Sequence, residues 1–375
     1  MPNIKHLIID GHLDAALNAL REERDQMLPV SAIRERETHI PKDKLGTCTV
    51  TFAQMKRCGV PLCMTTVLAR AKPWITPGRE NQGGDCDFPT QDMAYAMAMG
   101  QLAYYRELQR RGDVTIITDR PGLDALWARW QAGEPDAPVG LILTMEGADP
   151  ITDPSRLEHW YELGLRSVFL AHYGHSHYAA GTPAIDRPQS HEQDGPVTAE
   201  GFELLKEMGR LAMPLDMTHL SDTSFWDAAK VYGGPVYSSH TNCRVLADDP
   251  RQFTDEQIMF IVKRDGVLGL SMHFAMIKGG FTGETFRVDP ESVTLEHLVN
   301  HIDHICQLVG SAKHVAIGSD LDGGFGAERC PVGLDSCDDL HKIGPILASR
   351  GYSDTDIAGF CHGNWLRFLR RVLPK

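Results

Sequence analysis

The amino-acid sequence predicts an α/β fold of the (β/α)8, or TIM-barrel, type. Short apolar, β-branched runs recur along the 375 residues. Each run leads toward a longer amphipathic segment, which is the pattern of a parallel sheet with helical crossovers. Eight such units can be counted, the number that closes a barrel. An open doubly wound sheet is the alternative, but it requires a Gly-rich phosphate turn after an early strand. Asp10-Gly11-His12 is not such a turn.

Composition restricts the class of protein. The chain is 42% hydrophobic and 23% charged, with a net charge of -13, and its nine cysteines include no Cys-x-x-Cys pair. This balance is typical of a globular protein that binds neither nucleic acid nor an anionic membrane surface. We find no apolar run long enough for a membrane span, no signal-peptide core and no hydrophobic C-terminal tail. Scattered, reduced thiols then favour a cytoplasmic location.

The N-terminal third is predicted to supply the first two strands and one long helix. The first strand is expected over residues 4–9, and the second lies in one or both of the apolar runs at 48–52 and 62–68. Residues 92–111 are strongly helical and end before Gly112, a C-terminal stop signal. Two polar segments, both expected at the surface, separate these elements at residues 21–44 and 74–88.

The rest of the chain alternates strands and helices at regular spacing. Residues 139–145 (VGLILTM) form a continuous apolar run of the type found in buried parallel strands. Further strands are predicted over residues 165–171, 212–217, 235–239, 267–272 and 314–319. Helices are predicted over residues 153–163, 199–209, 223–231, 255–264, 294–309, 338–350 and 354–369. We therefore expect one domain, residues 1–375, with loop insertions near 71–91 and 174–196.

Groups that can ligate a metal or move a proton follow most of the predicted strands. In a barrel, the C-terminal strand ends meet at one face, where chemistry is located. His12 and Asp14 follow the first strand, and in extended backbone their side chains point to the same side. The remaining groups follow the third, fourth, fifth, sixth and eighth strands and are Glu146, His172, His219, His240 and Asp320. Each could be purely structural, but their convergence on one face indicates a site.

The donor set suits two divalent ions that share a carboxylate and a water. His12, Asp14 and Glu146 would hold one ion, and Glu146 with His219 and His240 would hold the other. Each ion would keep an open position, as a catalytic site requires.

Two groups remain for proton transfer and charge stabilisation. Asp320 would orient the attacking water, take its proton and pass it to the leaving group. His172 would donate a hydrogen bond to the oxyanion of a tetrahedral intermediate.

Other histidines and one cysteine are given structural roles. A helical face with three histidines is expected on the solvated outside of the barrel, and its members are His297, His301 and His304. Polar loop residues are expected at His175, His177 and His191. His273 could support the site or the fold, and nothing marks Cys243 as a nucleophile.

The motifs around the candidate residues occur in a distinctive order. They are His12-x-Asp14, Met145-Glu146-Gly147, His172, Thr218-His219-Leu220-Ser221, Ser239-His240, Gly318-Ser319-Asp320-Leu321-Asp322-Gly323-Gly324 and Gly363-Asn364-Trp365-Leu366-Arg367. In order and spacing they resemble the membrane (renal) dipeptidase family of the amidohydrolase superfamily. The most telling feature is the bridging Glu146, in place of the carbamylated lysine common elsewhere in that superfamily.

The resemblance implies a zinc-dependent dipeptidase that tolerates a D-residue at the C-terminal position of its substrate. In that family an arginine binds the substrate's terminal carboxylate, and Arg251 lies at the matching distance from His240. Members are often dimers, so a homodimer is expected. Residues 74–88 and 174–195 follow no pattern that can be carried over, which leaves the substrate preference open.

Two other interpretations remain. A related metal-dependent amidohydrolase could act on N-acyl amino acids, other small amides or lactones. A non-catalytic barrel could bind a metal or ligand, although such a protein has little need of Asp320.

Overall fold

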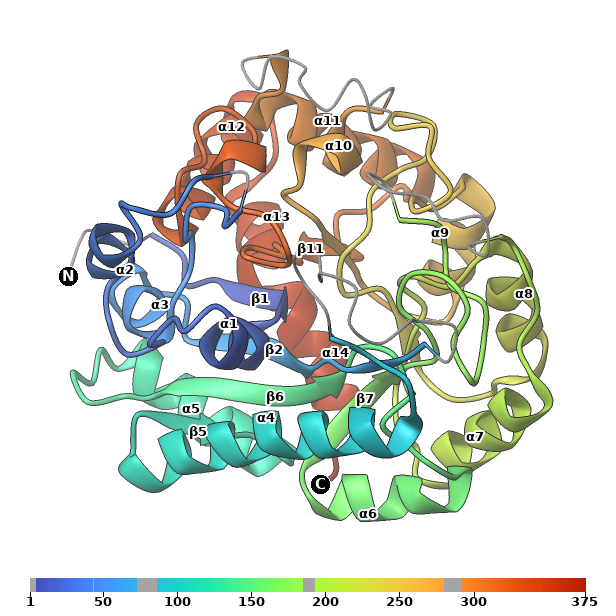
Figure 1. Cartoon of the computed structure of the whole chain (residues 1–375). Helices are drawn as coiled ribbons and strands as arrows, with labels where there is room; N and C mark the ends of the chain where they lie inside the picture. Colours follow the sequence, from blue (N-terminus) through green and yellow to red (C-terminus); the bar gives the residue numbers. More distant parts are fainter. Residues whose placement is uncertain (1–4, 43, 73–85, 185–192, 280–291) are drawn as a thin grey trace.

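A parallel sheet lies at the centre of the computed structural model, which describes residues 5–42, 44–72, 86–184, 193–279 and 292–375 (Figure 1). Its strands are arranged in the order β1-β2-β6-β7-β8-β9, and every pair is parallel. The bounds are β1 (Ile9–Leu13), β2 (Leu62–Val67), β6 (Val139–Met145), β7 (Leu165–Phe169), β8 (Leu215–Asp216) and β9 (Val236–Tyr237). Two more strands, β10 (Leu268–Leu270) and β11 (Val315–Ile317), form a parallel pair of their own.

The β10–β11 pair contacts both edges of the larger sheet. Ser238, directly after β9, forms a parallel bridge with Leu268 of β10. On the other side, the N–H of Asp320 donates to the carbonyl oxygen of His12 at 3.3 Å. Glycine permits the close approach, because a Cβ on Gly269 would lie 1.8 Å from the Ser239 carbonyl oxygen. The fold is therefore α/β, with a parallel sheet of TIM-barrel-like form.

Helices surround the strands (Figure 1). In the first half of the chain they are α1 (Ala15–Arg21), α2 (Val30–Arg36), α3 (Phe52–Cys58), α4 (Gln91–Arg111), α5 (Arg120–Gln131) and α6 (Leu157–Glu162). In the second half they are α7 (Ala199–Arg210), α8 (Asp222–Val231), α9 (Asp255–Lys263), α10 (Phe274–Ile277), α11 (Leu295–Val309), α12 (Ile343–Ser349), α13 (Asp354–Ala358) and α14 (Asn364–Val372). Within the described ranges, none of these helices combines the length and apolar character needed to cross a bilayer.

The C-terminal motif fixes the last helix beneath the strands. Trp365 of α14 is fully buried, and its indole N–H donates to the carbonyl oxygen of Ile317 in β11 at 2.7 Å. A Cβ on Gly11 would lie 2.5 Å from the Trp365 ring, so only glycine lets β1 pass this closely. Asn364 donates to the carbonyl oxygen of Val315 at 2.8 Å. The final helix thus holds β1 and β11 together.

Most predicted strands are confirmed, but the run at residues 48–52 is not a strand. Thr49 donates from its backbone N–H and its hydroxyl to the carboxylate of Asp322, at 2.8 and 2.6 Å. Thr51 then caps α3 by accepting from the N–H of Gln54. These apolar residues therefore face the core without joining the sheet.

The first strand also starts later than predicted. Of the expected strand over residues 4–9, residue 4 lies outside the described part, and β1 begins at Ile9 and ends at Leu13. His12 is therefore inside the strand, and Asp14 follows it directly.

Two elements between α4 and β6 were not predicted. The short strand β5 (Val114–Ile116) pairs with the first half of β6, and β7 pairs with the second half of the same strand. The helix α5 follows, capped by the Asp119 side chain.

The prediction that residues 21–44 lie on the surface is wrong for part of this segment. It contains α2, and Arg24 is only 2% exposed. The Arg24 guanidinium donates to Glu37 at 2.7 and 3.1 Å and lies 3.2 Å from Asp322. Charged composition alone does not show that an arginine has buried carboxylate partners far along the chain.

The predicted insertions fall partly outside the described residues, which omit 73–85 and 185–192. Beside the first gap, β3 (Arg70–Ala71) and β4 (Asp87–Phe88) form a short parallel pair.

Candidate metal centre

The predicted metal ligands converge on Glu146. Its Oε1 lies 3.5 Å from His12 Nε2, 3.1 Å from His219 Nε2 and 3.5 Å from His240 Nε2. Asp14 joins them through His12, with 3.8 Å between Asp14 Oδ2 and His12 Nε2. All five residues are buried, none more than 5% exposed. Residues from four different strand ends thus meet at one point.

The ligand atoms form overlapping groups of three, each within 4.8 Å of one another. One group is His12, Asp14 and Glu146, and a second is Glu146, His219 and His240. Glu146 belongs to both, the position that a bridging carboxylate would occupy.

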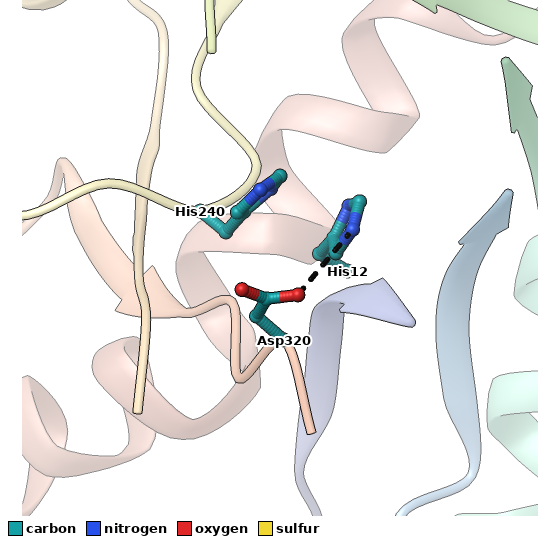
Figure 2. Close-up of side chains that lie close together, drawn as sticks. All are labelled: His12, His240 and Asp320. Carbon is teal, nitrogen blue, oxygen red and sulfur yellow. Dashed lines mark ion pairs between the residues drawn. The ribbon is translucent and has the colours of Figure 1, made fainter. Parts of the chain in front are cut away.

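Asp320 lies beside the same cluster. Figure 2 shows the imidazoles of His12 and His240 and the Asp320 carboxylate facing one another. Asp320 Oδ1 lies 3.8 Å from His12 Nε2. A group that accepts a proton from a molecule held by the cluster could act from this position.

The chemistry of the donor set fits a divalent cation. Within the described structure, His12 Nε2 and Glu146 Oε2 are buried and lack any hydrogen-bond partner. Burial, and secondarily the Asp14 carboxylate, raises the pKa of Glu146 well above its usual range. Burial also raises the pKa of Asp320 to about 8. Crowded, desolvated carboxylates beside unpartnered imidazole nitrogens are stabilised by a positive ion placed among them.

Two of the site residues adopt unusual backbone conformations. The φ angles of His219 and Asp320 are +69° and +59°. This left-handed region is uncommon for residues other than glycine, and such residues cluster at functional sites. The turns that follow β8 and β11 therefore aim these side chains into the cluster.

Hydrogen bonds behind the cluster orient the ligands. Ser239 Oγ lies 2.8 Å from His240 Nδ1, so Nε2 of that ring faces Glu146 Oε1 at 3.5 Å and His219 Nε2 at 3.0 Å. Asp216 in β8 accepts from the N–H of Ser239 at 3.1 Å. Thr66 donates to Asp14 through a short hydrogen bond. These supporting residues were not predicted from the sequence, although Asp216 has a recognisable signal, a carboxylate inside an apolar strand.

Asp10 supports the cluster from β1. Its carboxylate accepts from the N–H of His12 at 3.2 Å and from the N–H of Ser319 at 2.8 Å. It thereby joins the strand end that carries His12 to the one that carries Asp320. Asp10 was also missed, although it lies two residues before His12 and so on the same face.

Arg251 reaches the cluster from the loop after β9. It is 1% exposed, and its Nη2 donates to the His240 carbonyl oxygen at 2.9 Å and lies 3.2 Å from His219 Nε2. Its Nε and Nη1 are buried without a hydrogen-bond partner among the described residues. A buried guanidinium with two free donors is suited to an anionic group.

His172 completes the predicted set. Its Nε2 lies 3.8 Å from Glu146 Oε1, and its Nδ1 lies 2.6 Å from Arg70 Nη1. The structure therefore brings together all eight residues selected from the sequence.

The prediction that His301 lies on a solvated flank is wrong. His301 is fully buried, its Nδ1 accepts from the N–H of Cys243 at 3.0 Å, and its Nε2 lies 2.8 Å from the Ile277 carbonyl oxygen. The helical face that carries it packs inward over the loop after β9. His304 pairs instead with Asp255 at 2.7 Å.

Two histidines in other loops have different outcomes. His273 caps α10 through its side chain. His191 lies outside the described residues.

The model of the membrane dipeptidase family, peptidase family M19, matches residues 4–373. The chain belongs to this family. This match confirms the resemblance drawn from the motifs. As a metallopeptidase family, M19 implies the use of a divalent metal, and the cluster around Glu146 offers candidate ligands.

Curated dipeptidases are similar to part of the chain. An uncharacterized dipeptidase of Schizosaccharomyces pombe is 29% identical over 230 residues, 61% of this chain and 52% of its own length. This chain therefore matches about half the length of that curated relative.

Solved structures match over nearly the full length. Dipeptidase AC, a metallopeptidase of family M19, superimposes with a TM-score of 0.73 at 23% identity, covering 99% of each chain. A metallopeptidase from Rhodobacter sphaeroides, bound to a phosphinate mimic of the dipeptide L-Ala-D-Ala, gives 0.70 at 23% identity, covering 98% of this chain and 99% of the other. At this identity the matches show a shared fold.

Proposed function

We propose that this M19 member is a zinc-dependent dipeptidase with a two-metal site. The observation that carries the proposal is the position of Glu146, whose Oε1 lies 3.1 to 3.5 Å from the Nε2 atoms of three histidines. Glu146 also belongs to both three-ligand groups. A single carboxylate in this position suits a pair of ions better than one ion.

The proposed ligands divide into two sets that share Glu146. His12 and Asp14 would complete one set, and His219 and His240 the other. Mixed imidazole and carboxylate ligands suit zinc. When bound, such ions polarise a carbonyl oxygen and lower the pKa of a water toward neutrality.

Asp320 is proposed to move the proton. Its Oδ1 lies 3.8 Å from His12 Nε2, within reach of a water or substrate held by the cluster. It would accept a proton from the attacking water and then deliver that proton to the leaving amine nitrogen. In this role Asp320 would not be a metal ligand, although its carboxylate also forms a three-ligand group with His12 and His240.

Arg251 and His172 are proposed to hold the substrate. The free Nε and Nη1 of Arg251 lie on different edges of the guanidinium, and either can donate to the C-terminal carboxylate of a dipeptide. A buried cation that demands a carboxylate one residue from the scissile bond would restrict the substrate to dipeptides. His172 would donate from Nε2 to the oxygen of the carbonyl under attack.

Tolerance of a D-residue at the C-terminal position forms part of the proposal. It is supported by the family resemblance and by the L-Ala-D-Ala mimic bound to the R. sphaeroides relative.

We further infer that the strands close into a complete (β/α)8 barrel within a single domain. The bridge between Ser238 and Leu268 and the hydrogen bond from Asp320 to His12 support closure. A cytoplasmic location and a homodimer remain predictions from the cysteine content and from the family, respectively.

An alternative is hydrolysis of N-acyl amino acids, other small amides or lactones by the same metals. A dipeptide and an N-acyl amino acid can each present a carboxylate to Arg251. The group that distinguishes them is the free amine, which only the dipeptide has.

The proposal is tested on protein purified with zinc and analysed for metal content. We expect cleavage of L-Ala-D-Ala and of L,L-dipeptides and none of an N-acetyl amino acid. A preparation that contains two ions per chain and cleaves none of the dipeptides would contradict the proposal. Cleavage of the N-acetyl compound alone would favour the alternative.

A further inference from the structure

A contact between Arg70 and His172, beside the candidate metal ligands, has no part in the proposed mechanism. Arg70, in the short strand β3, places its Nη1 2.6 Å from Nδ1 of His172. The Arg70 side chain is only 15% exposed, and its Nε donates to Asp87 of β4. The guanidinium is therefore held in place from one side by Asp87 while it contacts the imidazole on the other.

The contact determines where the His172 proton resides. A guanidinium has donors and no acceptor. His172 Nδ1 must then accept through its lone pair, so a neutral ring carries its proton on Nε2. That nitrogen lies 3.8 Å from Glu146 Oε1 and faces the metal ligands. With the other tautomer, the ring would present a lone pair to the substrate.

We propose that Arg70 is a positioning residue that fixes His172 as an Nε2–H donor directed at the substrate carbonyl. The proposal rests on the proposed role of His172, which it deepens. Arg70 touches no reacting atom and acts only through the His172 ring.

Hydrogen bonds around Arg70 and His172 connect the segments that carry these two residues. The Asp149 carboxylate accepts from the N–H of Ala71 at 2.8 Å and from the N–H of His177 at 3.0 Å. Lys72 Nζ donates to the carbonyl oxygens of Tyr173 and His175, each at 2.7 Å. These bonds tie β3 to the loop that follows β7. The Arg70–His172 contact is therefore supported by the fold itself and does not require a bound substrate.

The direct test reads the tautomer by 15N NMR of the metal-loaded protein labelled at histidine, with the His172 signals assigned by their loss in His172→Gln. The wild type should show a protonated Nε2 and an unprotonated Nδ1. Arg70→Met, which keeps length but removes the donors, should populate the Nδ1–H tautomer. Arg70→Lys retains a donor without an acceptor and should restore the wild-type pattern.

A matched control separates the guanidinium from the loop it anchors. Lys72→Met removes the bonds to the Tyr173 and His175 carbonyl oxygens of the same loop and leaves the Arg70 guanidinium in place, so the Nε2–H tautomer should persist. The proposal is overturned if the wild type carries its proton on Nδ1, if Arg70→Met leaves the tautomer unchanged, or if Lys72→Met alters it equally.

Kinetics supply a second measure on a dipeptide substrate. Removal of a residue that orients an active-site group typically lowers activity by roughly 10- to 100-fold. Arg70→Met should therefore lower kcat by about that factor. The KM should change by less than about threefold, because the lost interaction belongs to the transition state. In a His172→Ala background, Arg70→Met should cost little further activity, because its effect passes through His172. A full, additive loss in that background would contradict the mechanism.

Failure of the two proposals can be told apart. If the wild type cleaves no dipeptide but shows the Arg70-dependent tautomer, the proposed function is wrong and the positioning role stands. If dipeptides are cleaved and the tautomer does not depend on Arg70, the proposed function stands and the positioning role is wrong.

Discussion

Replacing Arg251 by methionine tests how the proposed substrate is recognised. Arg251 Nη2 is already committed to the His240 carbonyl oxygen, so Nε and Nη1 are the two donors available to a carboxylate. Methionine preserves most of the side-chain volume in this buried position but provides no donor and no charge. Recognition of a terminal carboxylate should therefore be lost while the metal ligands remain.

The size of the effect follows from the one charged hydrogen bond that either of these donors can make to a carboxylate. Such a bond contributes about 1.5–3 kcal/mol. At about 1.4 kcal/mol per factor of ten, kcat/KM for a dipeptide should fall by roughly 10- to 10²-fold. Arg251→Lys keeps the charge but not the planar fork, and an intermediate loss is expected.

The assay compares a dipeptide with the same dipeptide amidated at its C-terminus. Wild type should strongly prefer the free carboxylate, and Arg251→Met should cleave both compounds at similar, low rates. Arg244→Met is the matched control, because Arg244 anchors the same loop through Asp222. This control should leave the preference intact. A preference that survives Arg251→Met would refute the assigned role.

Three further predictions concern the metal ligands, the proton and the fold. Asp14→Ala removes a ligand of only one proposed set, so metal analysis should find about one ion per chain; a content of two would show that the pairing is wrong. Asp320→Asn should keep its metal yet lose roughly 10²- to 10⁴-fold in kcat; unchanged turnover would remove Asp320 from the mechanism. Arg24→Met leaves the buried carboxylates of Glu37 and Asp322 unpaired and should lower the free energy of unfolding by about 3–5 kcal/mol in urea. A loss below about 1 kcal/mol, the range of surface ion pairs, would contradict that network.

The site was more predictable from sequence than its surroundings. Each ligand lies near the end of an apolar strand or within three residues after it, and parallel strands bring their C-terminal ends to one face. Knowing that His219 and Glu146 both end strands was therefore enough to place them together, although they are far apart in the chain.

Long-range contacts explain what the sequence did not reveal. Residues 48–52 have the composition of a strand, but Asp322 accepts their backbone N–H groups and removes them from the sheet. Arg24 and His301 look like surface residues until their buried partners are seen. Arg70 begins the short strand β3 with no motif around it, and its contact with His172 depends on how β3 meets the loop after β7.

The most direct test of the two-metal site is anomalous diffraction from crystals of the zinc-loaded protein, measured on both sides of the zinc absorption edge. Two anomalous peaks are predicted within the cluster. One should lie beside His12 and Asp14, the other beside His219 and His240, with Glu146 between them. A single peak, or two peaks that do not share Glu146, would contradict the account.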